Sequence, residues 1–473
     1  MKIIGRKRQQ AELNSLLASN KPEFAVVYGR RRVGKTYLIK EYFNNRFAFY
    51  HTGLANGSAK KQLRNFQKSL ELYGRTSYPK AEDWLDAFSQ LRQLLEMQDS
   101  PDGKRVVFID ETPWIDTRRS DFVSALEHFW NSWASSQPNI LLILCGAATS
   151  WIISKIMKNH GGLHNRVTQK IMLEPFTLAE CESFFAENNM EATRHQILEY
   201  YMILGGIPFY LDLIKKQYSV VQNIDLLFFA NNAVLKDEFE NLYASLFANA
   251  ENYMRIAETL AVKNKGLTRK ELIGGAKILD GAGTARMLEE LEQCGFIRKY
   301  HAFGKTSRES VYQLVDFFTL FYFRFIKNTR HNDEHLWEHL IDNQRHRAWT
   351  GFAFELVCLS HLQQIKAKLG IAGVLTSASV WQSKNSENGA QIDLVIDRND
   401  KVVNLCEIKF YNDQLVIDKD LNADLRRKKQ VFKDETKTRK SVHTTLISAY
   451  GIKPNACSRD IQSEVTMDDL FEL

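Results

Sequence analysis

The sequence predicts a multidomain α/β protein whose first 175 residues form a parallel sheet flanked by helices. Short apolar runs alternate there with stretches of helical periodicity, as expected when strands and helices follow one another. The runs are Phe24–Tyr28, Val106–Ile109 and Ile140–Leu144, and continuous apolar composition is typical of parallel strands covered on both faces. At 473 residues the chain is too long for one hydrophobic core, and its length predicts about three domains.

The composition is that of an ordinary soluble protein, with 44% hydrophobic and 25% charged residues. The sequence contains no apolar stretch of about 18 residues, so we expect no contact with a membrane. The first seven residues lack the apolar core of a secretory signal. Six cysteines lie far apart, in or beside apolar runs, which predicts reduced, buried thiols in a cytoplasmic protein and no metal bound by cysteine: Cys145, Cys181, Cys294, Cys358, Cys406 and Cys457.

The net charge of +7 is unevenly distributed along the chain. Eight basic residues crowd one short stretch near the C-terminus: Arg426, Arg427, Lys428, Lys429, Lys433, Lys437, Arg439 and Lys440. A polyanion such as DNA would favour this stretch, because phosphate contacts release counterions. A solvated helix face explains the same charges equally well.

A glycine loop follows the first apolar run and precedes a helical stretch. It reads Gly29, Arg30, Arg31, Arg32, Val33, Gly34, Lys35 and Thr36. In this setting the backbone N–H groups form a nest around phosphates, reinforced by the helix dipole. Lys35 is placed to reach the β- and γ-phosphates and Thr36 to ligate Mg²⁺, which predicts a site for ATP and magnesium. We expect most of the charge of the three arginines to face solvent.

The second apolar run ends in two acids, Asp110 and Glu111. Asp110 is placed to hold Mg²⁺, directly or through water, and Glu111 to polarise the attacking water. Two acids after an apolar run often mark only a strand that leaves the core. Their combination with the glycine loop favours the nucleotide interpretation.

Two further positions have a less specific pattern. Thr149 or Ser150, after the third apolar run, could sense the γ-phosphate, or could equally cap the helix that begins at Trp151. Arg166 lies on a glycine-bearing loop and could stabilise charge on the transferred phosphoryl group. A surface or salt-bridged arginine is the alternative. If Arg166 acts on a neighbouring copy, the active form is a homo-oligomer.

The central part of the chain predicts a helical region and a winged helix. Residues 176–249 have a helical pattern interrupted at Gly205–Pro208, and residues 250–316 predict three helices, capped in part by Thr268 and Thr284, and a β-hairpin. Residues 317–345 predict a helical linker. Basic residues of the winged helix could contact DNA phosphates, or the module could act as an internal lid: Arg286, Arg298, Lys299, Lys305 and Arg308.

Residues 346–473 contain a second set of side chains that could bind a metal ion and support a reaction. Glu355 lies in an apolar helix, and residues 390–397 and 401–410 predict a β-hairpin. If its turn centres on Asn399, residue 393 faces residue 405, and Asp393, Glu407 and Lys409 share one face. Such a set can bind Mg²⁺ and activate water for attack on a phosphodiester. A solvated hairpin face is the alternative.

The motifs together resemble those of the archaeal-type AAA ATPases, a family that also occurs in bacteria. The likeness covers nearly the whole chain and rests on five segments: Ile4–Arg6, Tyr28–Thr36, Phe108–Glu111, Gly205–Pro208, and Glu238-Phe239 before Leu246-Phe247. It implies that Lys35 and Thr36 bind phosphate and metal, that Asp110 and Glu111 are the Walker B pair, and that Arg166 is an arginine finger. Ala147 and Ala148 depart from the pattern, because related ATPases tend to have a polar sensor in this region.

The C-terminal set, Glu355, Asp393 and Glu407-Ile408-Lys409, resembles PD-(D/E)xK nucleases. The resemblances imply an α/β P-loop ATPase domain with a helical lid, a winged helix-turn-helix and an α/β restriction-endonuclease-like domain. The expected activity is ATP hydrolysis that controls a DNA-directed module. The alternative is an ATP-dependent signalling or assembly switch whose C-terminal domain binds a partner without cleaving DNA.

Overall fold

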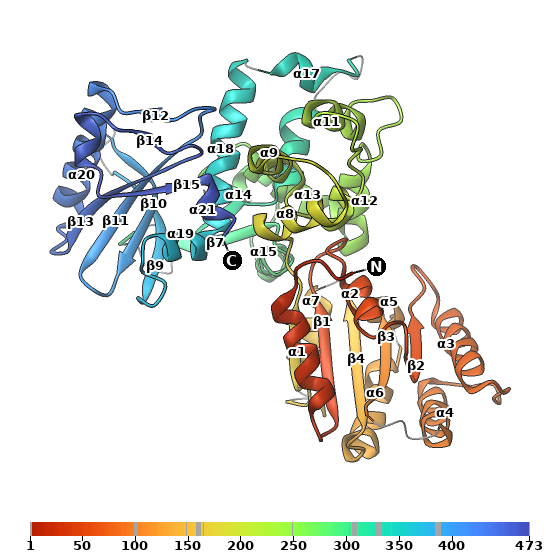
Figure 1. Cartoon of the computed structure of the whole chain (residues 1–473). Coiled ribbons are helices and arrows are strands. Elements are labelled where there is room, and N and C mark those ends of the chain that lie inside the picture. Colours follow the sequence, from red (N-terminus) through yellow and green to blue (C-terminus); the bar gives the residue numbers. More distant parts are fainter. Residues whose placement is uncertain are drawn as a thin grey trace. The chain divides into compact units, whose positions relative to one another are not determined.

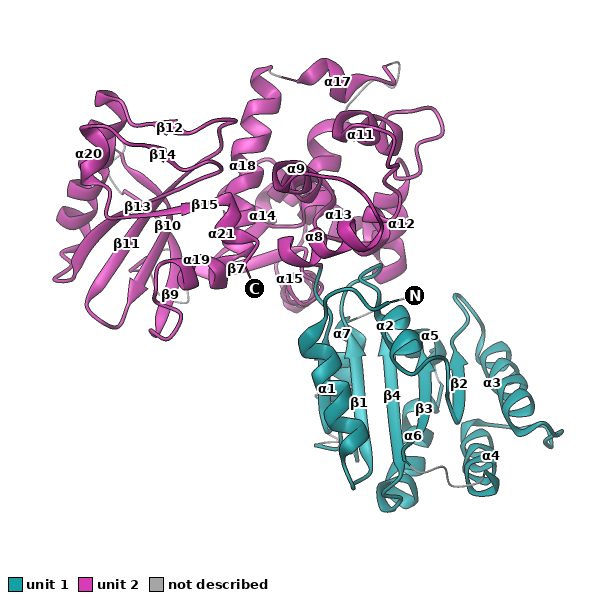
Figure 2. Ribbon diagram, viewed as in Figure 1, with its two compact units in different colours: residues 1–175 teal, residues 176–473 magenta. Residues whose placement is uncertain are grey.

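The computed structural model describes residues 2–98, 103–118, 120–147, 149–157, 162–163, 165–247, 249–301, 303–304, 310–327, 333–341, 343–383 and 389–472. The elements are labelled in Figure 1. The chain divides into two compact units, residues 1–175 and residues 176–473 (Figure 2). Each unit is described separately below.

The first unit is built on a five-stranded parallel sheet. Its strands are β1 (Glu23–Tyr28), β2 (Phe49–Thr52), β3 (Arg105–Asp110), β4 (Ile140–Gly146) and β5 (Gln169–Met172). Their order across the sheet is β2-β3-β4-β1-β5, and every pairing is parallel. The three strands expected from apolar runs are therefore confirmed, and they are the three central strands. Parallel pairing brings their carboxyl ends to one edge of the sheet, where ligands bind in open α/β folds.

Helix α1 (Lys7–Ala18) precedes the first strand, and further helices connect the strands: α2 (Lys35–Tyr42), α3 (Ala59–Gly74), α4 (Trp84–Met97), α5 (Thr112–Ile115), α6 (Phe122–Ser132) and α7 (Thr149–Trp151). Alternate residues of β1, β3 and β4 form one core with α3, α4 and α6. Phe66, Trp84, Phe88 and Phe122 make ring contacts within this core. These ring contacts pack the helices against the central strands. They thereby help to fix the position of the sheet edge at which the strands end.

The second unit begins with a helical region, as predicted. Its helices are α8 (Leu178–Glu187), α9 (Arg194–Leu204), α10 (Pro208–Leu211), α11 (Val220–Phe228) and α12 (Glu238–Leu246). Capping boxes start α8, α9 and α11 at Thr177, Thr193 and Ser219. Gly205 and Gly206, both with φ of 66°, end α9 and turn the chain toward α10.

Three helices and a small antiparallel sheet follow: α13 (Ala250–Ala261), α14 (Arg269–Ala276) and α15 (Ala282–Gln293), with β6 (Leu267–Thr268), β7 (Ile297–His301) and β8 (Ser310–Leu314) in the order β6-β8-β7. Thr268 caps α14 through a capping box, as expected. The cap expected at Thr284 is wrong. α15 begins earlier, after Gly281, and the Thr284 hydroxyl donates to the carbonyl of Leu279.

An aromatic segment joins this module to the rest of the unit. It comprises α16 (Phe317–Phe321) and a π-helical turn over Tyr322–Ile326. Phe318 packs on Tyr210 and Phe228, and Tyr322 stacks on Phe239. The segment is therefore part of the core of the helical region.

Helix α17 (Leu336–Leu340) follows and packs on α11. The C-terminal part is a mixed five-stranded sheet with flanking helices: α18 (Gln344–Ser360), α19 (Leu362–Lys368), α20 (Lys419–Thr436) and α21 (Met467–Leu470). Strands β9 (Thr376–Gln382), β10 (Gln391–Arg398) and β11 (Val402–Lys409) form an antiparallel meander. Helix α20 then leads to β13 (Ser441–Ser448), which lies parallel to β11, and β15 (Ser463–Thr466) lies parallel to β13. A short pair, β12 (Leu415–Val416) and β14 (Ile452–Lys453), completes the domain.

The register of the β10–β11 hairpin differs from the expected one. Val395, not Asp393, lies opposite Leu405, because the turn is one residue further along the chain and Lys401 adopts a left-handed conformation with φ of 66°. The pairing is displaced by two residues, which preserves the faces. Glu407 and Lys409 therefore keep one side of β11. Asp393 lies in β10 between Ile392 and Val395, where the register with β9 shifts.

Two expectations from composition can be compared with the structure. Within the described residues, no helix combines the length and apolar character that crossing a membrane requires. All six cysteines are free thiols, and five are buried. Cys457 is only half-buried, contrary to expectation, because it lies in a short 3-10 turn at the surface.

Candidate functional site

The glycine loop between β1 and α2 adopts a conformation that its sequence requires. Gly29 has φ of 143° and Gly34 has φ of 87°, values that favour glycine. A Cβ atom on Gly29 would lie 2.1 Å from the carbonyl oxygen of Leu173. Because that oxygen belongs to the backbone beside β5, it cannot move aside. The first glycine of the motif is thus fixed by packing as well as by backbone geometry.

Lys35 lies in the first turn of α2 and is 6% exposed. Its ammonium group donates to the carbonyl oxygens of Gly29 at 3.0 Å and Arg30 at 2.8 Å. These bonds hold the charge within the loop, beside the N–H groups that begin α2. A phosphate group bound there would meet both the ammonium and the positive end of the helix dipole.

Thr36, in the first turn of α2, and Asp110, at the end of β3, come together. The Thr36 hydroxyl donates a 2.7 Å hydrogen bond to Oδ2 of Asp110, and Asp110 is 3% exposed. Its other oxygen, Oδ1, accepts from the backbone N–H of Glu111 at 2.9 Å. A hydroxyl and a carboxylate are the hard oxygen donors that Mg²⁺ prefers, so these two residues fit the ion.

Glu111 follows Asp110 with an unusual backbone conformation, φ 47°. Its carboxylate accepts a hydrogen bond from the backbone of Ala147, at the end of β4. Burial raises the pKa of Glu111, Asp110 raises that pKa further, and Lys35 acts in the opposite direction. A carboxylate with a raised pKa is a better proton acceptor, which suits the role of polarising water.

Arginines surround the loop in ways that the sequence pattern did not reveal. Arg30 is 5% exposed, and Arg31 and Arg32 are half-buried, so the expectation that this charge faces solvent is wrong. Arg6, also buried, donates to the carbonyl of Val33 at 3.2 Å. Arg6 was part of a recognisable segment, but only the fold places it against the loop.

The candidate γ-phosphate sensors and the candidate arginine finger remain predictions. Thr149 is buried and lies in the first turn of α7, where its hydroxyl makes a long 3.5 Å contact with the carbonyl of Ala147. Ser150 is half-buried. Arg166 is exposed, in a turn closed by its N–H to the carbonyl of Leu163. Ala148 lies outside the described residues.

A family model described as an ATPase domain found predominantly in Archaea matches residues 4–214. The match includes the glycine loop, Asp110 and Glu111. Residues 4–214 contain an ATPase domain of this family. The chain is therefore an ATPase, and the parallel sheet described above is that of a P-loop ATPase.

Relatives of this ATPase are known from sequence and from structure. An uncharacterized protein of Methanocaldococcus jannaschii is 25% identical over 417 residues, which cover 86% of this chain and 87% of that protein. The Walker-type ATPase of Pyrococcus abyssi is 17% identical, with a TM-score of 0.48, and the match covers 68% of this chain and 96% of that one. The ORC2 protein of Aeropyrum pernix is 14% identical, with a TM-score of 0.42, 76% of this chain and 96% of that one being covered.

The ATPase has a second polar cluster in its C-terminal sheet. Glu407 on β11 is 4% exposed, and Lys409 lies 2.9 Å from its Oε1. Asp393 on β10 accepts a 3.0 Å hydrogen bond from the backbone N–H of Ile408. Glu355 belongs to α18, which packs on β11, and interacts electrostatically with Asp393, Lys409 and Glu407. The four residues expected to act together are thus near one another, and we call them the carboxylate cluster.

The charges of the carboxylate cluster act on one another. Burial, followed by repulsion from Asp393, raises the pKa of Glu355 to about 7. Burial and then Glu407 raise the pKa of Asp393. Burial lowers the pKa of Lys409, but the carboxylate of Glu407 outweighs it, and the pKa is raised overall. Neighbouring carboxylates repel one another when both are ionised, which raises their pKa values. A divalent cation bound between them would relieve this repulsion.

Two lysines that the sequence motif did not include also face this cluster. Lys428 on α20 donates to both carboxylate oxygens of Glu407, at 2.8 Å each. Lys265, from the turn between α13 and β6, interacts electrostatically with Asp393 and Glu355. Lys428 lay within a basic run, so its contact with Glu407 could be recognised only from the fold.

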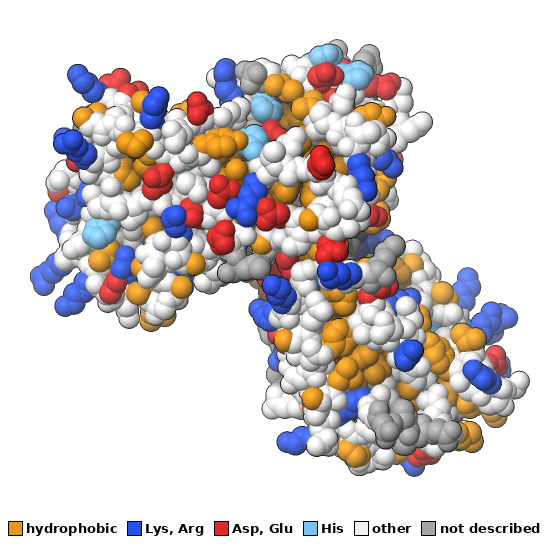
Figure 3. Space-filling model, in the orientation of Figure 1, with side chains coloured by type: hydrophobic (Ala, Val, Ile, Leu, Met, Phe, Trp, Pro, Cys, Tyr) orange, Lys and Arg blue, Asp and Glu red, His pale blue; other side chains and the backbone are white. Residues whose placement is uncertain are grey.

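The basic stretch near the C-terminus is partly neutralised by local ion pairs. Arg426 pairs with Asp460, Arg427 with Asp424, and Lys440 with Asp397. Five members are exposed, in α20 and in the segment that joins it to β13: Arg426, Arg427, Lys433, Lys437 and Arg439. Figure 3 shows basic side chains over this part of the second unit. The exposed charge fits a polyanion less strongly than the sequence alone suggests.

The basic residues of the three-helix module are also largely engaged. Arg298 bonds to Gln313 at 2.7 Å and stacks on Tyr300, and burial lowers its pKa to about 10. Arg286 pairs with Glu290 on its own helix. Lys299 is exposed, whereas Lys305 and Arg308 lie outside the described residues.

The hairpin of this module docks on the C-terminal sheet. The backbone N–H of Phe303 donates to the carbonyl of Val380 at 3.0 Å, and the Phe303 ring lies 5.0 Å from that of Phe432. Phe303 thereby joins a hydrophobic core that includes Trp381. The module is therefore held against the C-terminal sheet through the segment between β7 and β8.

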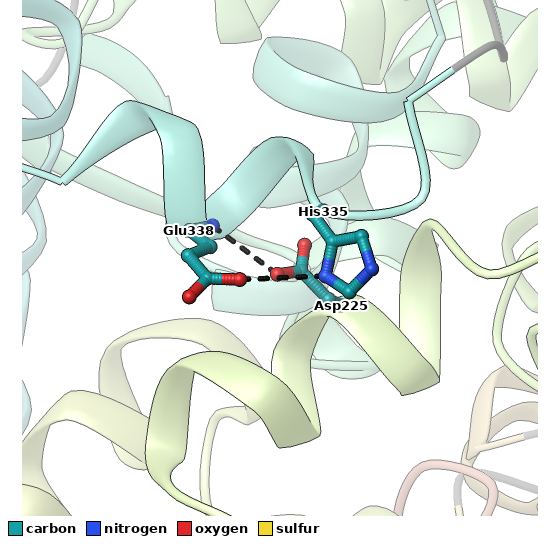
Figure 4. Close-up of side chains that lie close together, drawn as sticks. All are labelled: Asp225, His335 and Glu338. Carbon is teal, nitrogen blue, oxygen red and sulfur yellow. Dashed lines mark hydrogen bonds and ion pairs between the residues drawn. The ribbon is translucent and has the colours of Figure 1, made fainter.

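A third polar group lies between α11 and α17 (Figure 4). Side-chain donor atoms of Asp225, His335 and Glu338 lie within 4.8 Å of one another, close enough to share a metal ion. Asp225 already accepts hydrogen bonds from the backbone N–H groups of Trp337, at 2.7 Å, and Glu338, at 3.2 Å. Its buried carboxylate is accounted for as the cap of α17.

Proposed function

We propose that ATP hydrolysis in the first unit controls a DNA-directed module formed by the C-terminal part of the chain. The observation that carries the DNA-directed part is the carboxylate cluster, in which Glu355, Asp393, Glu407 and Lys409 come together from a helix and two strands. Such a cluster binds divalent cations, and cation-dependent sites of this type act on phosphodiesters.

In the ATP site, each residue has a separate role. Lys35 holds the β- and γ-phosphates, Thr36 and Asp110 hold Mg²⁺, and Glu111 orients the attacking water. The bound Mg²⁺ supplies charge neutralisation for the transferred phosphoryl group. The hydrogen bond between Glu111 and the end of β4 keeps the carboxylate oriented, because it ties two neighbouring strand ends together. Arg166 is proposed as the arginine finger, in which case the active form is an oligomer.

The architecture of the C-terminal part supports a nuclease-like domain. Two helices, α18 and α19, precede the three-stranded meander of β9, β10 and β11. After the short strand β12, helix α20 leads to the parallel strand β13. The carboxylates project from the central strands of this sheet, and α18 supplies the third. We propose that residues 346–473 form this domain, residues 317–345 the linker, residues 250–316 the winged helix and residues 176–249 the lid.

A second function is favoured by the internal contacts of the winged helix. Phe303 docks on the C-terminal core and Arg298 is engaged with Gln313. Both contacts fit a module that communicates between parts of the chain better than one that reads DNA. Under this alternative, ATP binding switches the assembly of the chain with a partner, and the carboxylate cluster does not cleave DNA.

ATP turnover measured with and without DNA distinguishes the two functions. Purified full-length protein is assayed with Mg²⁺ alone, with duplex DNA and with single-stranded DNA, and the integrity of the DNA is scored in the same samples. The DNA-directed function predicts turnover stimulated by DNA, with cation-dependent cleavage that is lost in Asp393→Ala and Lys409→Ala. Unchanged turnover and intact DNA of both forms, in Mg²⁺ and in Mn²⁺, would overturn it in favour of the switch.

A further inference from the structure

Glu407 is held by two ammonium groups from different elements. Lys409 contacts Oε1 at 2.9 Å from the same strand, and Lys428 contacts both oxygens at 2.8 Å from α20. Glu407 is 4% exposed and the side chain of Lys428 is 16% exposed, so this is a buried contact rather than a surface ion pair. A divalent cation bound by Glu407 would need the same carboxylate oxygens.

We propose that Lys428 competes with the divalent cation for Glu407 and sets the cation affinity of the carboxylate cluster. The inference rests on the proposed cation site in the C-terminal domain, and it is independent of the ATP site. Lys428 acts through Glu407 and is a positioning residue. While the Lys428 ammonium bonds to both oxygens of Glu407, neither oxygen is available to a divalent cation, and the ammonium repels that cation.

The charges that face the cluster support this competition. Three carboxylates, those of Glu355, Asp393 and Glu407, are faced by the ammonium groups of Lys409, Lys428 and Lys265. When all three carboxylates are ionised, the three ammonium groups balance their charge. A cluster of three carboxylates with one lysine would be strongly negative and would attract a cation, whereas the neutralised cluster does not.

Lys428 has a second carboxylate partner in addition to Glu407. Oδ2 of Asp424, one turn earlier on α20, lies 3.3 Å from its ammonium group. The side chain of Asp424 is 36% exposed, far more than that of Glu407. Lys428 can therefore leave Glu407 while keeping an ion pair, which makes exchange between lysine and cation feasible without an uncompensated buried charge.

The experiment is a Mn²⁺ titration of the nucleotide-free, full-length protein, followed by the electron paramagnetic resonance of free Mn²⁺. All variants carry Asp110→Asn, which removes the carboxylate proposed to hold the cation at the ATP site. Lys428→Met is compared with Lys428→Arg, which keeps the charge, and with Lys433→Met, which removes an exposed lysine from the same helix. Circular dichroism verifies that each variant is folded.

We expect Lys428→Met to bind Mn²⁺ at least tenfold more tightly than the parent, and Lys428→Arg and Lys433→Met to bind as the parent does. Adding Glu407→Gln to Lys428→Met should abolish the gain. Equal affinity in Lys428→Met and Lys433→Met would overturn the proposal, as would the absence of Mn²⁺ binding from every variant. DNA-stimulated ATP turnover, measured separately with Asp110 intact, reports on the proposed function as a whole.

Discussion

The hydroxyl of Thr36 donates a 2.7 Å hydrogen bond to Oδ2 of Asp110. The two residues are 74 positions apart: Thr36 lies in the first turn of α2, which follows β1 and the glycine loop, and Asp110 ends β3. Strand β4 separates β1 from β3 in the sheet. The bond joins the glycine loop to the acidic strand end, so the residues proposed to hold magnesium are already together. Little rearrangement is then needed when the ion binds with ATP.

Thr36→Val should lower Mg²⁺-dependent ATP turnover by about tenfold or more, because valine keeps the shape of threonine but removes the oxygen ligand. Thr36→Ser keeps the oxygen and should stay within roughly threefold of the parent. Turnover measured over a range of Mg²⁺ concentrations tests this. Equal loss in the two variants would show that shape, rather than metal ligation, is what Thr36 contributes.

Gly29→Ala should both destabilise the first unit and abolish ATP binding. A methyl group would collide with the carbonyl oxygen of Leu173 at 2.1 Å, in a conformation with φ of 143°. The expected loss of stability is about 2 kcal/mol or more. Thermal unfolding and binding of a fluorescent ATP analogue measure the two effects. The control is Gly283→Ala, within α15 and with open space around it, which should stabilise by about 0.5–1 kcal/mol.

The ATP site was predictable from sequence because its chemistry is local. Gly34, Lys35 and Thr36 are adjacent, and the apolar run before Asp110 indicates the strand that presents it. The contact of Arg6 with Val33 and the burial of Arg30 were not predictable, because they depend on how helix α1 and the loop pack in three dimensions. The carboxylate cluster was predicted by strand alternation, which survives a register error of two residues.

The role of Lys428 could not be predicted from sequence patterns. In the sequence it is one of eight clustered basic residues, and charge alone gave no reason to separate it from Lys433. Helical geometry places Lys428 over the sheet and Lys433 in solvent. The docking of Phe303 could not be predicted for a similar reason. An aromatic residue in a basic turn does not indicate which part of the chain it packs against.

Phe303→Ala should loosen the attachment of the hairpin to the C-terminal sheet. The residue packs against a core that includes Trp381 and Phe432, and its truncation should cost about 1–2 kcal/mol, less than for a fully buried phenylalanine. Chemical denaturation followed by tryptophan fluorescence measures this loss. Leu375→Ala, at a residue that is 74% exposed, should change stability by less than about 0.5 kcal/mol. A loss no larger in Phe303→Ala than in this control would contradict the docking.

Glu199 predicts a pH dependence of stability. Burial raises the pKa of this residue in α9 to about 7, above its unfolded value. The folded state therefore holds the proton more tightly, and stability declines as pH rises from about 4.5 to about 7. Glu199→Gln should stabilise by about 1 kcal/mol at about pH 8, a value reduced for partial solvent exposure, and by much less at about pH 5. Urea unfolding at both values tests this, and an equal gain at the two would contradict it.

The central claim is that the residues at the ends of β1 and β3 hydrolyse ATP. The most direct measurement compares ATP turnover and ATP affinity in the parent and in Glu111→Gln, which keeps the size of the side chain and removes its charge. We predict turnover reduced by about a hundredfold or more with affinity within roughly threefold of the parent, because Glu111 acts on water and not on the nucleotide. Parental turnover in Glu111→Gln would contradict the account.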